Sequence, residues 1–167
     1  LDVSGCGYAF EEVQSEHRLN EVIQIAAHTF TDDRFSVDPD LPGARQLAAK
    51  RYEAYIRSSY QRPDERVYRL YSQTTGQTLA FKTHRYTSKD EALALLGGVH
   101  ADFKGVGLAP LSGSYELLTL RENGIKRFTT HVSARNYAVM NLEIRGFGFR
   151  IVQTFAVLRK IYETASS

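Results

Sequence analysis

The residues from 104 to 109, Lys-Gly-Val-Gly-Leu-Ala, form a pattern that is typical of loops that bind phosphate groups. They follow an apolar run of strand length that ends near Val99, and they open a stretch with the hydrophobic spacing of a helix. The first N–H groups of a helix lack intrahelical partners and lie at the positive end of its dipole. Glycines let an anion approach that backbone closely. The spacing therefore predicts an anion site built from backbone N–H groups.

The glycine pattern excludes two common nucleotide-binding loops. Pro110 stands where the Gly-x-Gly-x-x-Gly fingerprint has its third glycine, and no Gly-Lys-Ser/Thr follows, as a P-loop requires. Pro110 is compatible with the first turn of a helix, where the N–H that it lacks has no intrahelical partner. A plain tight turn before a helix shows the same two glycines, and this alternative stays open.

His100, directly after the apolar run, is the first candidate for a general base, because imidazole titrates near neutral pH. Glu91 and Asp102 flank the same run, and His84 lies on the preceding expected strand. An ordinary strand histidine also explains His100. No pair among the histidines has metal-ligand spacing, so we expect chemistry without a metal.

The composition is that of a single soluble domain, residues 1–167. The chain is 43% hydrophobic and 24% charged, and its length suffices for a substantial core. A net charge of +2 gives no electrostatic case for a nucleic-acid partner. The single cysteine, Cys6, cannot form an internal disulfide, which favours a reducing compartment, and we expect a cytoplasmic protein. No apolar run approaches the ~18 residues of a membrane helix.

Hydrophobic spacing, glycines and prolines indicate the elements that must position the loop. The expected elements are a strand at 8–13, helices at 18–30 and 47–60, strands at 66–71, 78–87 and 93–99, a helix from 108, a strand at 128–132, a helix at 136–145 and a final strand or strand pair at 149–162. A turn at 73–77 predicts a hairpin between the strands that flank it. The order mixes strands and helices along the whole chain.

The loop at 104–109 resembles the acyl-CoA loop of the GNAT superfamily of N-acetyltransferases, which typically reads Gln/Arg-Gly-x-Gly-apolar-Gly/Ala after a strand. Lys104 replaces the usual Gln or Arg and keeps the positive charge, although a solvated surface lysine explains it equally well. The order of elements resembles the GNAT fold over nearly the whole chain. The resemblance implies an α/β (α+β) fold, with a mixed, mostly antiparallel central sheet flanked by about four helices.

The resemblance continues in Asn136, which is followed by a helix and a Gly-Phe pair. Val139 and Leu142 fit the spacing of the family, whereas Glu143 stands where a tyrosine is usual. The pair at 148–149 lies one residue later than expected, which implies a one-residue insertion or a helix bulge. The resemblance implies that Asn136 contacts the cofactor or a catalytic water, but a helix N-cap explains an asparagine there equally well.

A narrower resemblance lies near the front of the chain. Residues 33–35, 38–39 and 49–58 resemble GNAT members that acetylate nucleotide-linked amino sugars, the TDP-fucosamine acetyltransferase type. This resemblance implies that Arg34 and Phe35 bind the substrate. The forked guanidinium of Arg34 suits a phosphate, although a surface arginine is equally plausible.

The implied activity is acetyl-CoA-dependent N-acetylation of a primary amine by direct transfer, with a nucleotide-linked amino sugar as the favoured acceptor. In such a site, backbone N–H groups at Val99 and Ala101 bind the pantetheine and polarise the thioester carbonyl. The pyrophosphate is bound by Lys104, Gly105, Val106, Gly107, Leu108 and Ala109. The expected catalytic residues are His100 and Asn136, and Asn136 also belongs to the expected cofactor contacts.

Two other functions remain open at this stage. One is acetylation of a protein or a small amine. The other is a non-catalytic acyl-CoA-binding module, which the missing tyrosine at position 143 favours. In each case acetyl-CoA or a related thioester is the expected ligand, no nucleic acid or membrane is expected, and a homodimer is left open.

Overall fold

The computed structural model describes residues 7–30, 43–156, 158 and 160. Its residues form two compact units, 1–133 and 134–167, and each is described by itself. The expectation that residues 1–167 make one domain stays a prediction.

The first unit is built on a five-stranded sheet in the order β1-β2-β3-β4-β5. The antiparallel part consists of β1 (Tyr8–Glu12), β2 (Glu65–Ser72), β3 (Thr78–Tyr86) and β4 (Glu91–Val99), each paired with the next. The last strand, β5 (Arg127–Thr130), runs parallel to β4. The expected mixed, mostly antiparallel sheet and the hairpin between β2 and β3 are therefore confirmed.

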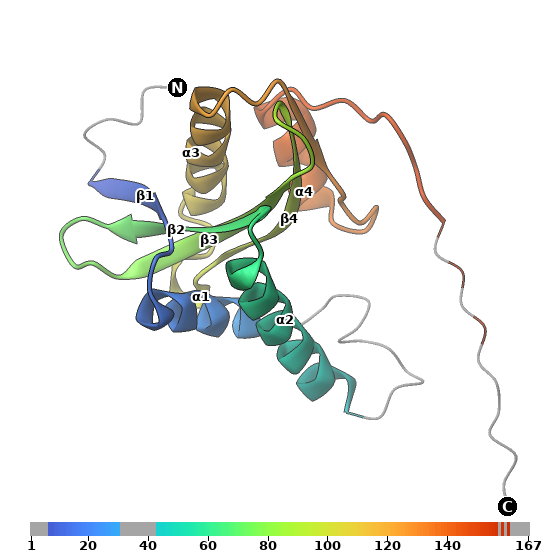
Figure 1. Cartoon of the computed structure of the whole chain (residues 1–167). Coiled ribbons are helices and arrows are strands. Elements are labelled where there is room, and N and C mark those ends of the chain that lie inside the picture. Colours follow the sequence, from blue (N-terminus) through green and yellow to red (C-terminus); the bar gives the residue numbers. More distant parts are fainter. Residues whose placement is uncertain (1–6, 31–42, 157, 159, 161–167) are drawn as a thin grey trace, which may run out of the picture. The chain divides into compact units, whose positions relative to one another are not determined.

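Helices cover both faces of this sheet. Figure 1 shows α1 (Glu16–Thr29) and α2 (Ala44–Gln61) on one face and α3 (Leu108–Glu122) on the other. α1 begins after Ser15, whose side-chain oxygen accepts a hydrogen bond from the N–H of Arg18 at 3.4 Å. Such a cap satisfies one of the free donors at a helix start.

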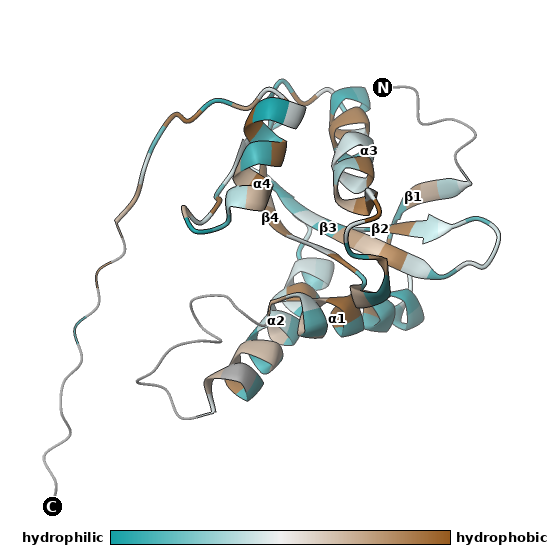
Figure 2. Ribbon diagram, turned by 180° about the vertical axis from the view of Figure 1, so that it is seen from behind, coloured by the Kyte–Doolittle hydropathy of each residue, from teal (hydrophilic) through white to brown (hydrophobic). Residues whose placement is uncertain are grey.

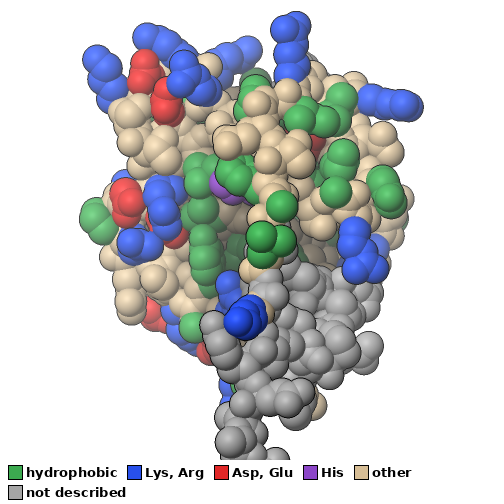
Figure 3. All heavy atoms as spheres, turned by 90° about the vertical axis from the view of Figure 1, so that its right-hand side faces the viewer, with side chains coloured by type: hydrophobic (Ala, Val, Ile, Leu, Met, Phe, Trp, Pro, Cys, Tyr) green, Lys and Arg blue, Asp and Glu red, His purple; other side chains and the backbone are tan. Residues whose placement is uncertain are grey.

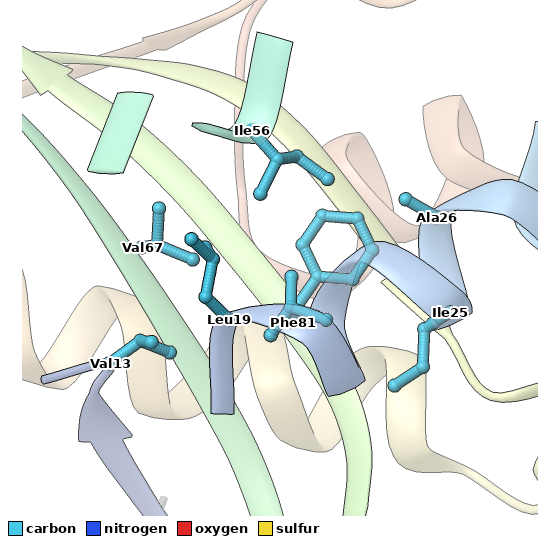
Figure 4. Close-up of a cluster of buried hydrophobic side chains, with 8 residues drawn as sticks. Val13, Leu19, Ile25, Ala26, Ile56, Val67 and Phe81 are labelled. Atoms are coloured by element: carbon cyan, nitrogen blue, oxygen red, sulfur yellow. The ribbon is translucent and has the colours of Figure 1, made fainter. Parts of the chain in front are cut away.

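The main core lies between the sheet and the pair α1 and α2. Figure 4 shows the side chains that converge there: Val13, Leu19, Val22, Ile25, Ala26, Ile56, Val67 and Phe81. Phe81 of β3 is the largest of the fully buried side chains, and burying a side chain of this kind contributes about 1.5–3 kcal/mol. On the opposite face, Leu108 at the start of α3 packs with Leu70, Leu79 and Ala80. Figure 2 shows the hydrophobic residues of β3 and β4 next to those of α1.

The described part of the second unit contains one short helix, α4 (Tyr137–Asn141), which continues directly into a π-helical turn, η2 (Leu142–Gly146). A π turn holds one residue more than an α-helical turn requires. This turn accommodates the extra residue that displaces the Gly-Phe pair at 148–149, so the expected helix bulge is confirmed.

The final strand expected at 149–162 is not formed in the described part of that range, residues 149–156, 158 and 160. The large apolar side chains there are exposed: Ile151, Val152, Phe155 and Leu158. Alternating apolar residues suit a strand, but a strand also needs a hydrogen-bonded neighbour. No described strand pairs with this segment, and for that reason the prediction is wrong for these residues.

Charged side chains of both signs lie on the face shown in Figure 3. On the face shown in Figure 3, Lys and Arg side chains are spread out with Asp and Glu between them, in keeping with the net charge of +2. Within the described ranges, no helix combines the length and the apolar character needed to cross a membrane.

Candidate functional site

The second half of β4 has a free edge. The parallel pairing of β4 with β5 joins residues 91–94 to residues 127–130 and ends there. On its other side, β4 stays paired with β3 as far as Val99, which lies opposite Ala80. Within the described sheet, the backbone of residues 95–99 therefore has a strand neighbour on one side only.

A β-bulge accompanies the separation of β4 from β5. Thr83 pairs with Leu96 and His84 with Ala94, so Leu95 is an extra residue on β4. The hydroxyl oxygen of Thr83 accepts a hydrogen bond from the N–H of Leu96 at 2.9 Å and holds the bulge in place. Because a bulge bends its strand and increases the local twist, it turns β4 away from β5 just after their last pair.

The free edge presents the backbone groups of Gly97 and Val99. The N–H of His100 donates to the carbonyl oxygen of Leu79 at 2.7 Å, so His100 directs its N–H toward β3. Successive residues of a strand direct their N–H and C=O groups to opposite edges. The N–H and C=O groups of Val99 and Gly97 therefore point to the free edge, where a ligand could pair with them as a strand does.

Two glycines let neighbouring groups approach β4 closely on both faces. A Cβ on Gly98 would lie 2.7 Å from the ring of Phe81 and 2.7 Å from the hydroxyl oxygen of Thr29 in α1. A Cβ on Gly97 would lie 3.0 Å from Cδ and 3.5 Å from Nζ of Lys82. The side chain of Lys82 thus lies over Gly97.

The loop after β4 leads into an open helix N-terminus. It contains the short helix η1 (Ala101–Phe103), and then Gly105 and Gly107 with φ of +82° and +87°. Gly107 is the N-cap of α3 and supplies no side-chain hydrogen bond to the first turn. A Cβ on either glycine would meet no atom within 4 Å. The first N–H groups of α3 thus have no side-chain cap, and the space beside both glycines is open, which suits an anion site.

The side chains of this loop divide into an exposed set and one anchor. Lys104 and Val106 are exposed, as are Ala101 and Ala109. Leu108, in contrast, is 3% exposed and packs in the core under α3. Its side chain fixes the start of the helix, so that only its backbone is available to a ligand.

His100 has a structural role that bears on the base hypothesis. Its Nδ1 accepts a hydrogen bond from the N–H of Asp102 at 3.3 Å and caps η1, and its ring contacts Phe103. A neutral imidazole whose Nδ1 accepts carries its proton on Nε2 and has no second lone pair to offer. His100 can therefore act as a base only after it releases Asp102.

Of the other candidate bases, Asp102 is exposed beside His100, whereas Glu91 and His84 are less available. Glu91 pairs with Arg127 at 2.5 Å, and His84 is fully buried. Among the described residues, no group of three or more His, Cys, Asp or Glu side chains could hold a metal ion.

The first unit brings most of the expected site residues onto one continuous stretch, from Val99 through His100 and Ala101 to the loop at 104–109. Asn136 belongs to the second unit, where its side-chain oxygen accepts a hydrogen bond from the N–H of Val139 at 3.2 Å and caps α4. The N-cap explanation of Asn136 is thereby confirmed. Arg34 and Phe35 lie outside the described residues.

A buried polar cluster under α3 was missed by the sequence analysis. Glu116 of α3 is 3% exposed, and its two carboxylate oxygens lie 3.4 Å from Nζ of Lys82 and 3.4 Å from Nδ1 of His84. The ring of His84 stacks on Tyr68, whose pKa is raised by burial and by the neighbouring Tyr86. The available signal was the two-residue spacing of Lys82 and His84, which places both side chains on one face of their strand.

No protein-family model matches the sequence, and no curated protein matches it. Solved structures do match. The ribosomal-protein-S18-alanine N-acetyltransferase from Escherichia coli is 17% identical, with a TM-score of 0.64 over 87% of this chain and 79% of that chain. The aminoglycoside 6'-N-acetyltransferase AAC(6')-Ih from Acinetobacter baumannii is 13% identical, with a TM-score of 0.60 over 94% of this chain and 100% of that chain.

A third match was solved with a ligand. AAC(6')-Iy, in complex with the bisubstrate analogue CoA-S-monomethyl-acetylneamine, is 12% identical, with a TM-score of 0.61 over 93% of this chain and 99% of that chain. At these identities the likeness shows the fold, which is that of the GNAT acetyltransferases. These three structures give no support to the subtype that acetylates nucleotide-linked amino sugars.

Proposed function

We propose that this chain is an acetyl-CoA-dependent N-acetyltransferase that transfers the acetyl group directly to a primary amine. The observation that carries the proposal is the continuity between the free edge of β4 and the open N-terminus of α3. The pyrophosphate of CoA binds the N–H groups of the loop at 104–109, and the pantetheine lies along the free edge. Its amides then pair with the backbone of Val99 and Gly97 as a neighbouring strand does.

This arrangement supplies the main requirements of acetyl transfer. The thioester is held against β4, where a backbone N–H can polarise its carbonyl and stabilise the oxyanion that forms on attack. Holding the amine and the thioester together lowers the entropic part of the barrier. The amine loses its proton to water or to His100, once that imidazole has released the N–H of Asp102.

The acceptor is proposed at the level of a primary amine. The fold neighbours are named for amine acceptors of different kinds, an aminoglycoside and an alanine of a ribosomal protein. A nucleotide-linked amino sugar is the narrower proposal. It depends on the motif around Arg34 and Phe35 and draws no support from the structural neighbours.

Replacing Arg34 with alanine tests that narrower proposal. If the guanidinium binds a phosphate of the acceptor, the KM for a nucleotide amino sugar rises about tenfold or more, the size of a lost charge-assisted hydrogen bond. The Kd for acetyl-CoA stays at its wild-type value. Steady-state kinetics and calorimetry measure the two quantities. The control is Arg57→Ala, at a structural arginine that pairs with Glu53 of α2 and Glu16 of α1. Equal losses for both ligands indicate a structural arginine, and acetylation of simple amines alone contradicts the acceptor class.

Position 143 is expected to contribute little to the chemical step. The GNAT resemblance places a thiolate-protonating tyrosine there, but this chain has Glu143, and an ionised carboxylate is a poor proton donor. Glu143→Gln should keep kcat within about tenfold of wild type, because a positioned acid contributes about 10² or more. Tyr137→Phe, at a residue that is 71% exposed, should be as mild. A hundredfold loss in Glu143→Gln, with CoA affinity intact, would identify the glutamate as the acid.

Because Glu143 replaces the usual tyrosine, a second function also fits the chain, that of a non-catalytic acyl-CoA-binding module. A thermal-shift screen with CoA, acetyl-CoA and amino-sugar nucleotides tests the shared part of both functions. A ligand at 100 times its Kd should stabilise the fold by about 2.7 kcal/mol. An absence of any shift at millimolar CoA contradicts both. A shift with acetyl-CoA but no turnover of any amine favours the binding module.

A further inference from the structure

Lys82 places a cation beside the part of β4 where the thioester of a bound acetyl-CoA would lie. Its side chain extends from β3 over Gly97, on the face of the sheet that carries α3. Nζ lies 3.5 Å from the point that a Cβ on Gly97 would occupy. Gly97 is exposed, and its N–H and C=O groups face the free edge. A larger residue at this position would push the ammonium away, so the glycine keeps it beside that edge.

The ammonium is held in place from behind. Glu116, buried under α3, lies 3.4 Å from Nζ through one carboxylate oxygen and 3.4 Å from Nδ1 of His84 through the other. In the described part of the chain, Glu116 is the one ion-pair partner of Lys82. An ammonium has three N–H donors, so donors remain for a ligand at the free edge. The side chain of Lys82 is 18% exposed, which leaves the cation within reach of that edge.

We propose that Lys82 is a catalytic residue that donates an N–H hydrogen bond to the sulfur of CoA and stabilises the thiolate as it leaves. The proposal rests on the proposed function, because the sulfur reaches Gly97 only when the pyrophosphate binds at 104–109 and the pantetheine follows the free edge. Gly97 lies on this path, two residues before Val99, or about 7 Å along the strand.

Acetyl transfer by this route needs no side chain that acts as an acid. The amine nitrogen attacks the thioester carbon, and the carbonyl electron pair moves to oxygen to give a tetrahedral intermediate. When the carbonyl forms again, the C–S bond breaks and its electron pair goes to sulfur, beside the ammonium of Lys82. The attacking nitrogen gives up its extra proton to solvent or a base, and the CoA thiolate takes a proton from solvent. The products are the amide and CoA thiol.

This role explains how the reaction proceeds with Glu143 in place of a tyrosine. A thiol ionises near pH 8.5, so a thiolate is a tolerable leaving group when its charge is stabilised. Hydrogen bonds between ionised groups are about twice as strong as neutral ones, and they strengthen as charge develops on sulfur. The competing explanation is that the pair of Lys82 and Glu116 only ties α3 to β3.

Two variants of Lys82 separate these explanations. Lys82→Met removes the charge, and Lys82→Arg keeps it and keeps a partner for Glu116. The measured quantities are kcat at saturating acetyl-CoA and the pKa of the thiol of bound CoA, followed by the ultraviolet absorption of the thiolate. Lys126→Met, at an exposed lysine that pairs with Asp90, is the matched control.

For Lys82→Met we expect kcat to fall about a hundredfold, as for the loss of one donor to a developing negative charge. We also expect the pKa of the bound thiol to rise by about 1–3 pH units, because a nearby cation no longer favours the thiolate. Lys82→Arg should keep kcat within about tenfold of wild type and keep the thiol pKa low. Lys126→Met should leave both quantities unchanged.

Lys82→Met leaves Glu116 without its cation and can lose stability for that reason. If it fails to fold, the double variant with Lys82→Met and Glu116→Gln is compared with the single variant Glu116→Gln. Both of these proteins lack the buried carboxylate charge of Glu116. The proposal is overturned if Lys82→Met changes kcat by less than about threefold relative to the protein that retains Lys82, or if it leaves the pKa of the bound thiol unchanged. Lys82 then has a structural role. A wild-type protein that turns over no amine contradicts the proposed function instead, so the two failures are distinct.

Discussion

Gly107→Val is expected to abolish the stabilisation of the protein by CoA while the fold itself survives. A Cβ at this position meets no atom within 4 Å, so the space beside Gly107 is open to a side chain. It fills the open space in front of the N-terminus of α3, where the pyrophosphate is proposed to bind. With CoA at 100 times its Kd, wild type should gain about 2.7 kcal/mol and the variant nothing. The melting temperature with and without CoA measures the difference.

The control must reproduce the backbone strain of this substitution, because Gly107 has a φ of +87°. Gly124, at the other end of α3, has a φ of +81° and equally open surroundings. A left-handed conformation costs a non-glycine residue about 1–2 kcal/mol, so both valine variants should lose similar stability without ligand. Gly124→Val should keep the full CoA shift. A full shift in Gly107→Val would show that CoA does not use this loop.

Gly98→Ala is expected to destabilise the fold by about 1–3 kcal/mol, the usual cost of overpacking. Its new methyl group would lie 2.7 Å from both the ring of Phe81 and the hydroxyl of Thr29, in the layer where α1 packs on β4. Gly97→Ala adds the same methyl group on the opposite face, where the nearest atom is Cδ of the long Lys82 side chain at 3.0 Å. We expect a change of about 0.5 kcal/mol or less there.

Urea denaturation of the two variants measures the difference in the free energy of unfolding. A large loss in Gly98→Ala alone supports the close packing of α1 on β4. Equal losses in both variants would mean that the side chain of Lys82 is held as rigidly as the core. Little effect in either would contradict the close approach of α1 to this strand.

The features that depend on neighbouring residues could be predicted from the sequence. Gly105 and Gly107 are suited to positive φ, and the apolar spacing after them defines α3, so the loop and its helix appear as expected. The late Gly-Phe pair predicted the bulge that the π turn after α4 provides. The side chain of Asn136 caps the helix that follows it, as a local preference suggests.

The features that depend on distant residues could not be predicted in this way. The ion pair of Lys82 with Glu116 joins β3 to α3, and the sequence of neither segment indicates that these two residues pair. The extra residue Leu95, which accompanies the separation of β4 from β5, becomes visible only when the register with β3 is known. The same limit explains the error at 149–162, since alternation describes a strand face but does not supply a pairing strand.

The most direct test of the central claim is the transfer of an isotopically labelled acetyl group from acetyl-CoA to an amine. The protein is incubated with labelled acetyl-CoA and a panel of aminoglycosides, peptides with free N-termini and nucleotide amino sugars, and the masses of the products are measured. We expect at least one amine to gain one labelled acetyl group, with release of an equal amount of CoA, and Gly107→Val to produce none. Binding of acetyl-CoA without labelled product from any amine would contradict the proposed acetyl transfer.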